Sequence, residues 1–106
     1  MKQQSKALGT LGLAMKSGNV VSGEFLTEQA IRSGRAELVI VAEDASANTR
    51  KKFQNSCNYY HVPIAILGNK DVLGNAIGKE FRASLAVLDK GFAASIRKQL
   101  EIEKTV

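Results

Sequence analysis

Cys57 and His61 are the only cysteine and the only histidine of the chain, and both residue types often act in enzyme active sites. No motif places a nucleophile beside His61, which lies two residues before Pro63. Cys57 falls four residues after Phe53 on the apolar face of a predicted helix, where it is interpreted as a small core residue. Both residues are therefore interpreted as structural, and we expect no enzyme.

Other patterns typical of catalytic and cofactor sites are missing from the sequence. The glycine-containing segments 68–70 and 73–79 match neither a nucleotide-binding phosphate loop nor a dinucleotide fingerprint. One cysteine allows no internal disulfide and no zinc site built from several cysteines. Glu43-Asp44 follows an apolar run, but adjacent carboxylates seldom converge as an acid–base pair, and helix capping is the simpler interpretation. We expect neither a metal nor a cofactor.

Three segments have side chains that are suited to binding. Ser22-Gly23 ends a β-branched run and opens a helix, whose free N–H groups are able to receive an anion or a nucleic-acid backbone. Ala42-Glu43-Asp44 follows the strongest strand, and residues 78–82 contain an aromatic side chain and two cations. In an α/β sandwich such loops gather at one end of the sheet. The mixture is typical of a site for folded RNA with an unpaired base rather than for a small metabolite.

Hydrophobic periodicity indicates the elements that position these segments. The run 37–42 is apolar on both faces, which predicts a central strand covered on both sides, and 62–67 is interpreted as a second buried strand. Alternating helices and buried strands predict an α/β fold, a three-layer α/β/α sandwich with a small mixed four-stranded sheet. Helices are expected at about 5–15, 23–33, 49–60, 71–77 and after a cap at Asp89, and strands at 19–22, 37–42, 62–67 and 84–88.

Length and charge narrow the class of protein. The 106 residues suffice for one hydrophobic core, so a single domain, 1–106, is expected. The net charge of +5 favours a polyanionic partner or, equally, a solvated basic surface. The basic run Arg50–Lys52 has the same two interpretations. The N-terminal segment is not typical of a signal peptide, and no apolar run approaches the ~20 residues of a membrane-spanning helix. We expect a soluble, cytoplasmic protein without a membrane partner.

Several spaced motifs resemble one known family. The run 33–44 (SGRAELVIVAED), Val62-Pro63, the segment 73–78 (LGNAIG) and the segment 86–91 (AVLDKG) together resemble the ribosomal protein L7Ae family, particularly its small bacterial members. The resemblance extends from about Ala7 to Ile96 and implies the same α/β/α fold. It also implies kink-turn RNA as the ligand.

The resemblance implies specific contacts. In that family the N-terminus of the second helix docks against tandem sheared G·A pairs, and a loop before the last strand covers an extruded base. The motif glycine corresponds to Gly23 and the loop to about 79–83. Archaeal and eukaryotic members have Asn-Glu where this chain has Phe25-Leu26, and a lysine where it has Gln29. Glu24 adds negative charge where phosphate would approach.

We therefore expect non-enzymatic binding of structured, kink-turn-like RNA by a ribosomal or ribosome-associated protein. The partners expected are structured ribosomal RNA and other ribosomal proteins, and the free protein is expected to be a monomer. The alternative is a protein-interaction module that keeps the fold without tight RNA binding, which exposed side chains at Phe25 and Leu26 would favour. The residues predicted to bind RNA are Ser22, Gly23, Glu24, Gln29, Arg32, Glu43, Lys79, Phe81 and Arg82.

Overall fold

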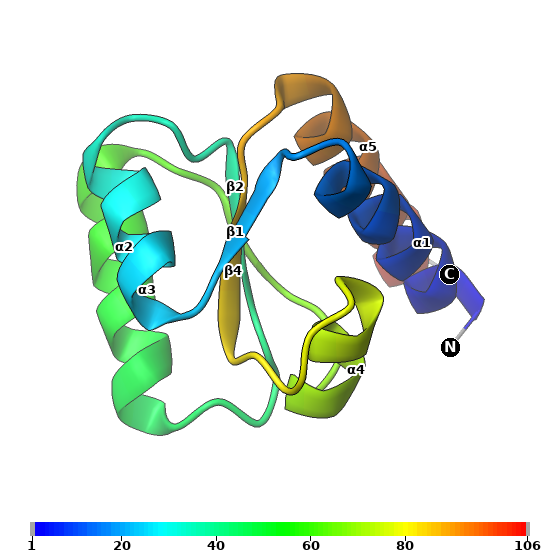
Figure 1. Cartoon of the computed structure of the whole chain (residues 1–106), viewed down its shortest axis with the longest axis horizontal. Helices are drawn as coiled ribbons and strands as arrows, with labels where there is room; N and C mark the ends of the chain where they lie inside the picture. Colours follow the sequence, from blue (N-terminus) through cyan, green and yellow to red (C-terminus); the bar gives the residue numbers. More distant parts are fainter. Residues whose placement is uncertain (1, 106) are drawn as a thin grey trace.

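The computed structural model describes the backbone of residues 2–105 and the side chains of residues 6–101. Within these residues, five helices alternate with four strands (Figure 1). The predicted order of elements is confirmed, with shifts of a few residues at their ends. The helices are α1 (Lys2–Lys16), α2 (Glu24–Arg32), α3 (Ala47–Tyr60), α4 (Lys70–Ala76) and α5 (Lys90–Thr105), and the strands are β1 (Val20–Ser22), β2 (Leu38–Val41), β3 (Ile64–Ile66) and β4 (Ser84–Val87).

The four strands form one mixed sheet in the order β1-β4-β2-β3. β4 is antiparallel to both of its neighbours, with Ser22 opposite Leu85 and Val41 opposite Ser84, whereas β2 and β3 are parallel. This pairing confirms the predicted mixed four-stranded sheet. It also brings the carboxyl ends of β1, β2 and β3 to the same edge of the sheet as the amino end of β4.

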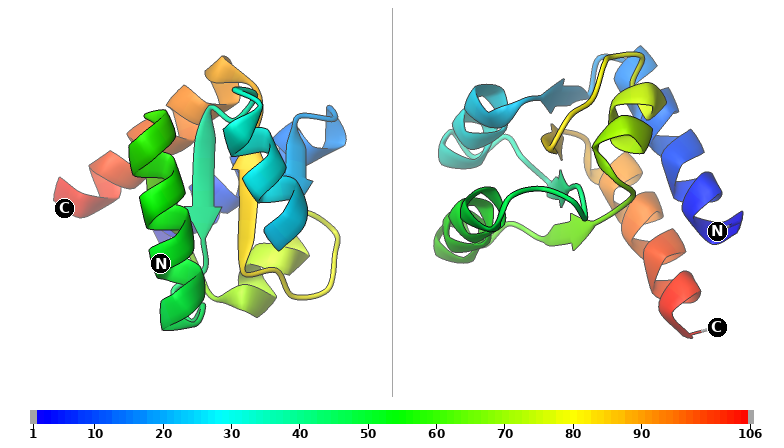
Figure 2. Two further views of the ribbon diagram at one scale, coloured as in Figure 1. Left: turned by 90° about the vertical axis from the view of Figure 1, so that its left-hand side faces the viewer. Right: turned by 90° about the horizontal axis from the view of Figure 1, so that it is seen from below.

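The helices cover both faces of the sheet, which confirms the three-layer sandwich (Figures 1 and 2). One core cluster joins α2 and α3 to one face, and a second joins α1, α4 and α5 to the other. All four residues of β2 are buried. Its position inside the sheet explains why the run 37–42 is apolar on both faces rather than alternating.

The prediction of a strand within residues 62–67 is confirmed, but the prediction that this strand is buried is wrong. β3 is an edge strand whose three residues are half-buried or exposed, and 50% of the surface of Ile66 is accessible. An edge strand has only one hydrogen-bonded neighbour, so its outer side is open and its residues are only partly covered. Pro63, which lacks a backbone donor, directly precedes β3 and is a residue type found at strand starts and edges.

Polar side chains fix the beginnings of three helices. Ser46 Oγ accepts a hydrogen bond of 3.1 Å from the Thr49 N–H at the start of α3. Asn69 Oδ1 caps α4 in the same way. The predicted cap at Asp89 is confirmed, because its carboxylate accepts from the Phe92 N–H at 2.9 Å. Among the helices described, none combines the length and the apolar character needed to cross a membrane.

Candidate nucleic-acid interface

The three predicted binding segments lie at one edge, which we call the sheet rim: Ser22-Gly23, residues 42–44 and residues 78–82. Backbone hydrogen bonds tie the first two segments to the residues that directly follow the third, from the Gly23 N–H to the Ser84 carbonyl at 3.0 Å and from the Ala42 N–H to the Ala83 carbonyl at 2.9 Å. A side-chain bond of 3.1 Å runs from Arg82 Nε to Ser22 Oγ. The sheet topology thus brings together segments that are up to 60 residues apart in sequence.

Gly23 determines how the chain turns from β1 into α2. Its backbone has φ 93° and ψ 162°, a conformation that is essentially restricted to glycine. A Cβ built on Gly23 would have no neighbour within 4 Å, so the space in front of it is open. No side chain caps α2, and within residues 2–105 no acceptor contacts the N–H groups of residues 24–26. The turn therefore presents three backbone donors beside a surface that a ligand can approach closely.

The first turns of α2 present apolar side chains to solvent. Phe25 is 75% exposed and Leu26 is 44% exposed. Gln29 is also exposed and lies one turn further along the same side, at i+4 from Phe25 and i+3 from Leu26. A ligand that reaches the N–H groups of residues 24–26 meets two hydrophobic side chains and one amide.

Glu24 is paired across the helix layer. Its carboxylate lies 2.8 Å from Lys52 Nζ of α3, and both side chains are substantially exposed. The pair offsets part of the negative charge that Glu24 adds at the start of α2. Lys52 was not among the predicted site residues, because only the packing of α2 beside α3 brings it to the sheet rim.

The loop before β4 contributes Lys79, Phe81 and Arg82. Phe81 is 61% exposed, and Lys79 is exposed as well. Arg82 is half-buried and internally bonded, since Nη1 donates to the Phe81 carbonyl at 3.0 Å and its backbone N–H donates to the Lys70 carbonyl at 3.0 Å. With its bond to Ser22, Arg82 ties the loop to β1 and α4.

Gly74 sets the position of this loop, although sequence reasoning gave it no role. A Cβ at Gly74 would overlap the carbonyl oxygen of Glu80 and would lie 2.8 Å from the Cα of Phe81. The Gly74 carbonyl also accepts from the Lys79 N–H at 2.9 Å. A glycine inside a helix was a signal for close backbone approach, but the approaching segment could not be named from the sequence.

Glu43 and Asp44 also lie at the sheet rim, with different roles. The Asp44 carboxylate accepts a hydrogen bond of 2.8 Å from the Lys70 N–H, so it helps cap α4. Capping is therefore confirmed for Asp44, on α4 rather than on α3, the helix that directly follows it. The Glu43 backbone N–H donates to the Gly68 carbonyl at 2.8 Å, while its side chain is exposed.

The structure does not bring Arg32 to the sheet rim. Arg32 lies in the last turn of α2, and its Nε donates to Glu28 at 2.8 Å, which confirms the i, i+4 pair expected from the sequence. Glu28 also accepts from Ser56 Oγ at 2.8 Å. Burial alone would raise the pKa of Glu28, but the hydrogen bonds from Arg32 and Ser56 and the nearby positive charges outweigh it and lower the pKa. Glu28 is thus an ionised link between α2 and α3.

Cys57 and His61 lie in different surroundings near the end of α3. Cys57 is buried against the sheet, and burial, together with the charge of Glu28, raises the pKa of its thiol to about 11. His61 is exposed and ends α3 with a left-handed backbone, φ 60°. Within the described residues, no group of three or more His, Cys, Asp and Glu side chains could hold a metal ion.

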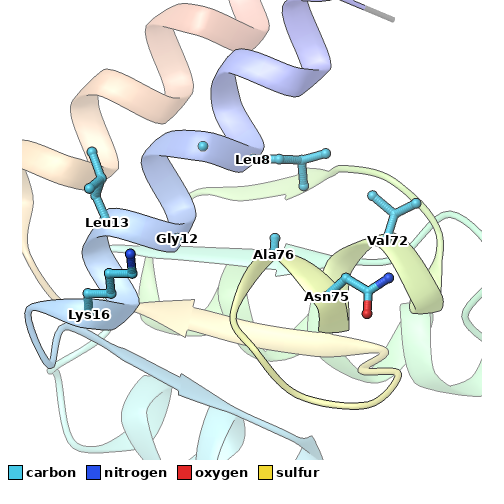
Figure 3. A pocket seen from close by; sticks show the side chains of 8 residues that line it. Leu8, Gly12, Leu13, Lys16, Val72, Asn75 and Ala76 are labelled. Atoms are coloured by element: carbon cyan, nitrogen blue, oxygen red, sulfur yellow. The ribbon is translucent and has the colours of Figure 1, made fainter.

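A groove of about 540 Å³ lies between α1 and α4, on the opposite face of the sheet from α2 and α3 (Figure 3). Leu8, Leu13 and Val72 give it an apolar lining, and among the side chains that the structure describes Lys16 is the only charged one that lines it. Gly12 lets the two helices pack closely, because a Cβ there would lie 3.0 Å from the Ala76 carbonyl oxygen. The groove contributes no side chain to the sheet rim.

Comparison with known proteins gives consistent matches. Residues 5–97 match the Ribosomal protein L7Ae/L30e/S12e/Gadd45 family. RNA-binding protein YlxQ of Bacillus subtilis is 50% identical over 91 residues, which cover 86% of this chain and 91% of that protein. Large ribosomal subunit protein eL30 of Neurospora crassa is 37% identical over 97 residues, which cover 85% of each.

Two solved structures share the fold. A protein with unknown function from Bacillus halodurans is similar with a TM-score of 0.88 and 35% identity, covering 91% of this chain and 97% of that one. The 15.5kD RNA binding protein of Giardia lamblia is similar with a TM-score of 0.83 and 21% identity, covering 96% of this chain and 90% of that one. The second likeness concerns the fold alone.

Proposed function

The chain belongs to the Ribosomal protein L7Ae/L30e/S12e/Gadd45 family, and on this basis we propose that it binds structured, kink-turn-like RNA at the sheet rim and catalyses no reaction. One observation carries the proposal. The uncapped start of α2 at Gly23 lies at the same edge of the sheet as the loop that carries the exposed Phe81. A bent RNA that exposes base edges and one unpaired base is complementary to these two features.

The sheet rim offers RNA contacts that do not depend on polar side chains in α2. Gly23 allows the nucleic-acid backbone to approach closely, and the N–H groups of residues 24–26 donate to base edges or phosphate oxygens. Gln29 provides an amide at the same side, and Phe81 covers the unpaired base. Lys79 binds phosphate, while Arg82 keeps the loop next to Ser22.

The same proposal includes the cellular setting. Relatives named RNA-binding protein YlxQ and large ribosomal subunit protein eL30 support a ribosomal or ribosome-associated role in the cytoplasm. The chain acts as a single RNA-binding domain and is a monomer when free, and structured ribosomal RNA is its main partner. Other ribosomal proteins are further partners in this setting.

A titration tests the proposal. A kink-turn RNA and a straight duplex of equal length and charge are titrated with the protein at two salt concentrations. We expect tighter binding of the kink-turn RNA at both concentrations. Equal affinities that both vanish with added salt would reduce the interaction to nonspecific electrostatic attraction and refute the proposal.

Two matched variants locate the contact. Gly23→Asp adds bulk and negative charge at the start of α2, and Gly34→Asp adds the same group at the other end of that helix. Both glycines have positive φ, and neither has a neighbour within 4 Å of an added Cβ, so each variant strains the backbone without a steric clash. Only Gly23→Asp is expected to abolish kink-turn selectivity, with circular dichroism showing that both variants are folded. Equal effects of the two variants would contradict docking at the sheet rim.

The exposure of Phe25 and Leu26 favours a second candidate function, a protein-interaction module on the same fold. Phe25→Ser with Leu26→Ser distinguishes the two functions. An RNA-binding rim is expected to lose part of its kink-turn affinity in this variant, because the two side chains flank the backbone donors. A variant that binds kink-turn RNA like the wild type, but no longer associates with ribosomal proteins, would favour the interaction module.

A further inference from the structure

The outer surface of α3 carries cations and no acidic side chain. None of the 14 residues of α3 is acidic, although the chain as a whole has ten acidic residues. Its cations lie near the start of the helix, amides follow, and aromatic side chains come at the end. The exposed residues of this surface are Arg50, Lys51, Lys52, Gln54, Asn55, Asn58, Tyr59, Tyr60 and His61.

Helical spacing sorts these side chains into two adjacent stripes. Lys51, Asn55 and Tyr59 follow one another at i, i+4 and i+8 along the side opposite the buried Phe53. Arg50, Gln54 and Asn58 form a parallel stripe that faces the edge of the sheet. Each stripe begins with a cation and continues with an amide. We call the two stripes together the α3 surface.

A groove borders the α3 surface where the helix passes the edge strand β3. It has a volume of about 380 Å³, and its polar lining comes from Gln54, Asn58 and His61 of the α3 region and from Arg97 of α5. All four of these side chains belong to exposed residues. The groove therefore combines two amides, an imidazole and a guanidinium next to the second stripe.

The acids on the neighbouring helix α2 are already paired. Glu24 lies 2.8 Å from Lys52, and Glu28 lies 2.8 Å from both Arg32 and Ser56. These contacts reduce the repulsion that an approaching phosphate would otherwise meet from α2. No element covers the outer side of α3 in the ribbon view that faces it (Figure 2, left).

We propose that the α3 surface and its bordering groove bind single-stranded RNA, as a second site separate from the sheet rim. Proteins that bind single strands combine cations that contact phosphates with aromatic rings on which bases stack. Lys51 and Arg50 contact the phosphates, and Tyr59, which is 75% exposed, stacks on a base. Amides such as those of Gln54 and Asn58 hydrogen-bond the edges of unpaired bases, which a duplex would hide.

α3 connects this second site in space with the sheet rim. Because β1 and β2 run in the same direction, α2 and α3 both begin at the sheet rim, and Lys52 contacts Glu24 there. From there α3 extends for about 21 Å at 1.5 Å per residue. A single strand that leaves an RNA bound at the rim is able to follow α3 toward Tyr59. The inference rests on the proposed function only for this continuous path.

The experiment uses the full chain and two labelled RNAs in fluorescence anisotropy. One is a kink-turn RNA with flush ends, and the other is an unstructured oligouridine of about twelve nucleotides, within the length that one small domain covers. Lys51→Gln combined with Tyr59→Ala is expected to weaken oligouridine binding about tenfold or more, because one phosphate contact and one stacking contact are lost. Its affinity for the flush kink-turn RNA is expected to stay unchanged.

Controls separate the site from net charge and from the sheet rim. Lys90→Gln removes one positive charge at the start of α5 and is expected to leave oligouridine binding nearly unchanged. Tyr59→Phe keeps the ring and is expected to retain the affinity that Tyr59→Ala loses. Gly23→Asp is expected to show the reverse pattern, with loss of kink-turn binding and retention of oligouridine binding.

Several outcomes would overturn the inference. These are oligouridine binding that is unaffected by the double variant, a loss that Lys90→Gln reproduces, or a parallel loss of flush kink-turn binding. Capture of a protein on the α3 surface without oligouridine binding would also overturn it. A wild-type protein that ignores kink-turn RNA but binds oligouridine through Lys51 and Tyr59 would refute the proposed function alone.

Discussion

Gly74→Ala tests whether one buried glycine holds the loop of the sheet rim in place. The added Cβ would overlap the Glu80 carbonyl oxygen and would lie 2.6 Å from the carbonyl carbon. The carbon must move by at least about 0.8 Å to reach the 3.4 Å at which ordinary contact begins, and the oxygen must move further. The obstacle is backbone and cannot rotate away. Overpacking of this kind costs about 1–3 kcal/mol, whereas alanine in place of glycine inside a helix gains about 1 kcal/mol.

We expect the free energy of unfolding to fall by about 1–2 kcal/mol, since displacement of the loop also weakens the bond from the Lys79 N–H to the Gly74 carbonyl. Urea denaturation monitored by circular dichroism measures the change. Gly9→Ala is the matched control, because Gly9 also lies inside a helix and an added Cβ there has no neighbour within 4 Å. It is expected to gain up to about 1 kcal/mol.

The same variant links the loop to RNA binding. Moving the Glu80 backbone displaces Phe81, so kink-turn affinity is expected to fall in Gly74→Ala at concentrations of urea where the variant is fully folded. Gly9→Ala is expected to bind like the wild type. A Gly74→Ala protein that is more stable than the wild type would refute the steric argument. A variant that is less stable but binds RNA as tightly as the wild type would show that Gly74 does not influence the RNA-binding loop.

Three further predictions concern backbone strain and ionisation. Gly23→Ala should lower the free energy of unfolding by about 1–3 kcal/mol although the space at its Cβ is open, because alanine is strained at φ 93°. Thermal denaturation measures the change, and a variant as stable as the wild type would contradict this strain. Burial holds the pKa of Cys57 at about 11 against an ordinary value of 9.0, so stability should fall as pH rises from 9.0 toward 11. Cys57→Ala should remove this dependence in urea titrations. The pKa of Glu28 is lowered, so the stability it provides is present above pH 4.5 and is lost as pH falls through its folded value. The stability of Glu28→Gln should therefore fall less steeply with decreasing pH than the stability of the wild type. An equally steep fall in both proteins would exclude this role of Glu28.

The sequence predicts the frame of the molecule because its strongest signals are periodic. The run 37–42, which is apolar on both faces after Glu37, indicated a central strand, and β2 is central and buried. The run 62–67 is similarly apolar, yet β3 lies at the edge. A short apolar run shows that a strand exists, but the number of its neighbours depends on strand order, which local sequence does not encode.

The candidate site was predictable to the extent that it follows from topology. Ser22, Glu43 and Arg82 lie near one another because their loops share an edge of the sheet. The pairing of Glu24 with Lys52 depends on how α2 packs beside α3. The contact of Gly74 with the loop depends on how the backbone of Glu80 and Phe81 turns back toward α4. Neither contact has a periodic pattern that the sequence could reveal. Arg32 shares the helix of Gly23 but lies at its other end.

The insertion of β4 between β1 and β2 has a consequence for how the protein acquires its site during synthesis. β1 and β2 have no direct pairing, and each is hydrogen-bonded to β4, whose residues 84–87 come late in the chain. A nascent chain that stops before residue 83 has neither the strand that joins β1 to β2 nor the carbonyl groups of Ala83 and Ser84 that accept from Ala42 and Gly23. The sheet rim therefore forms only when most of the polypeptide has left the ribosome. Under the proposed function, a growing chain is expected to bind RNA there only once its fold is nearly complete.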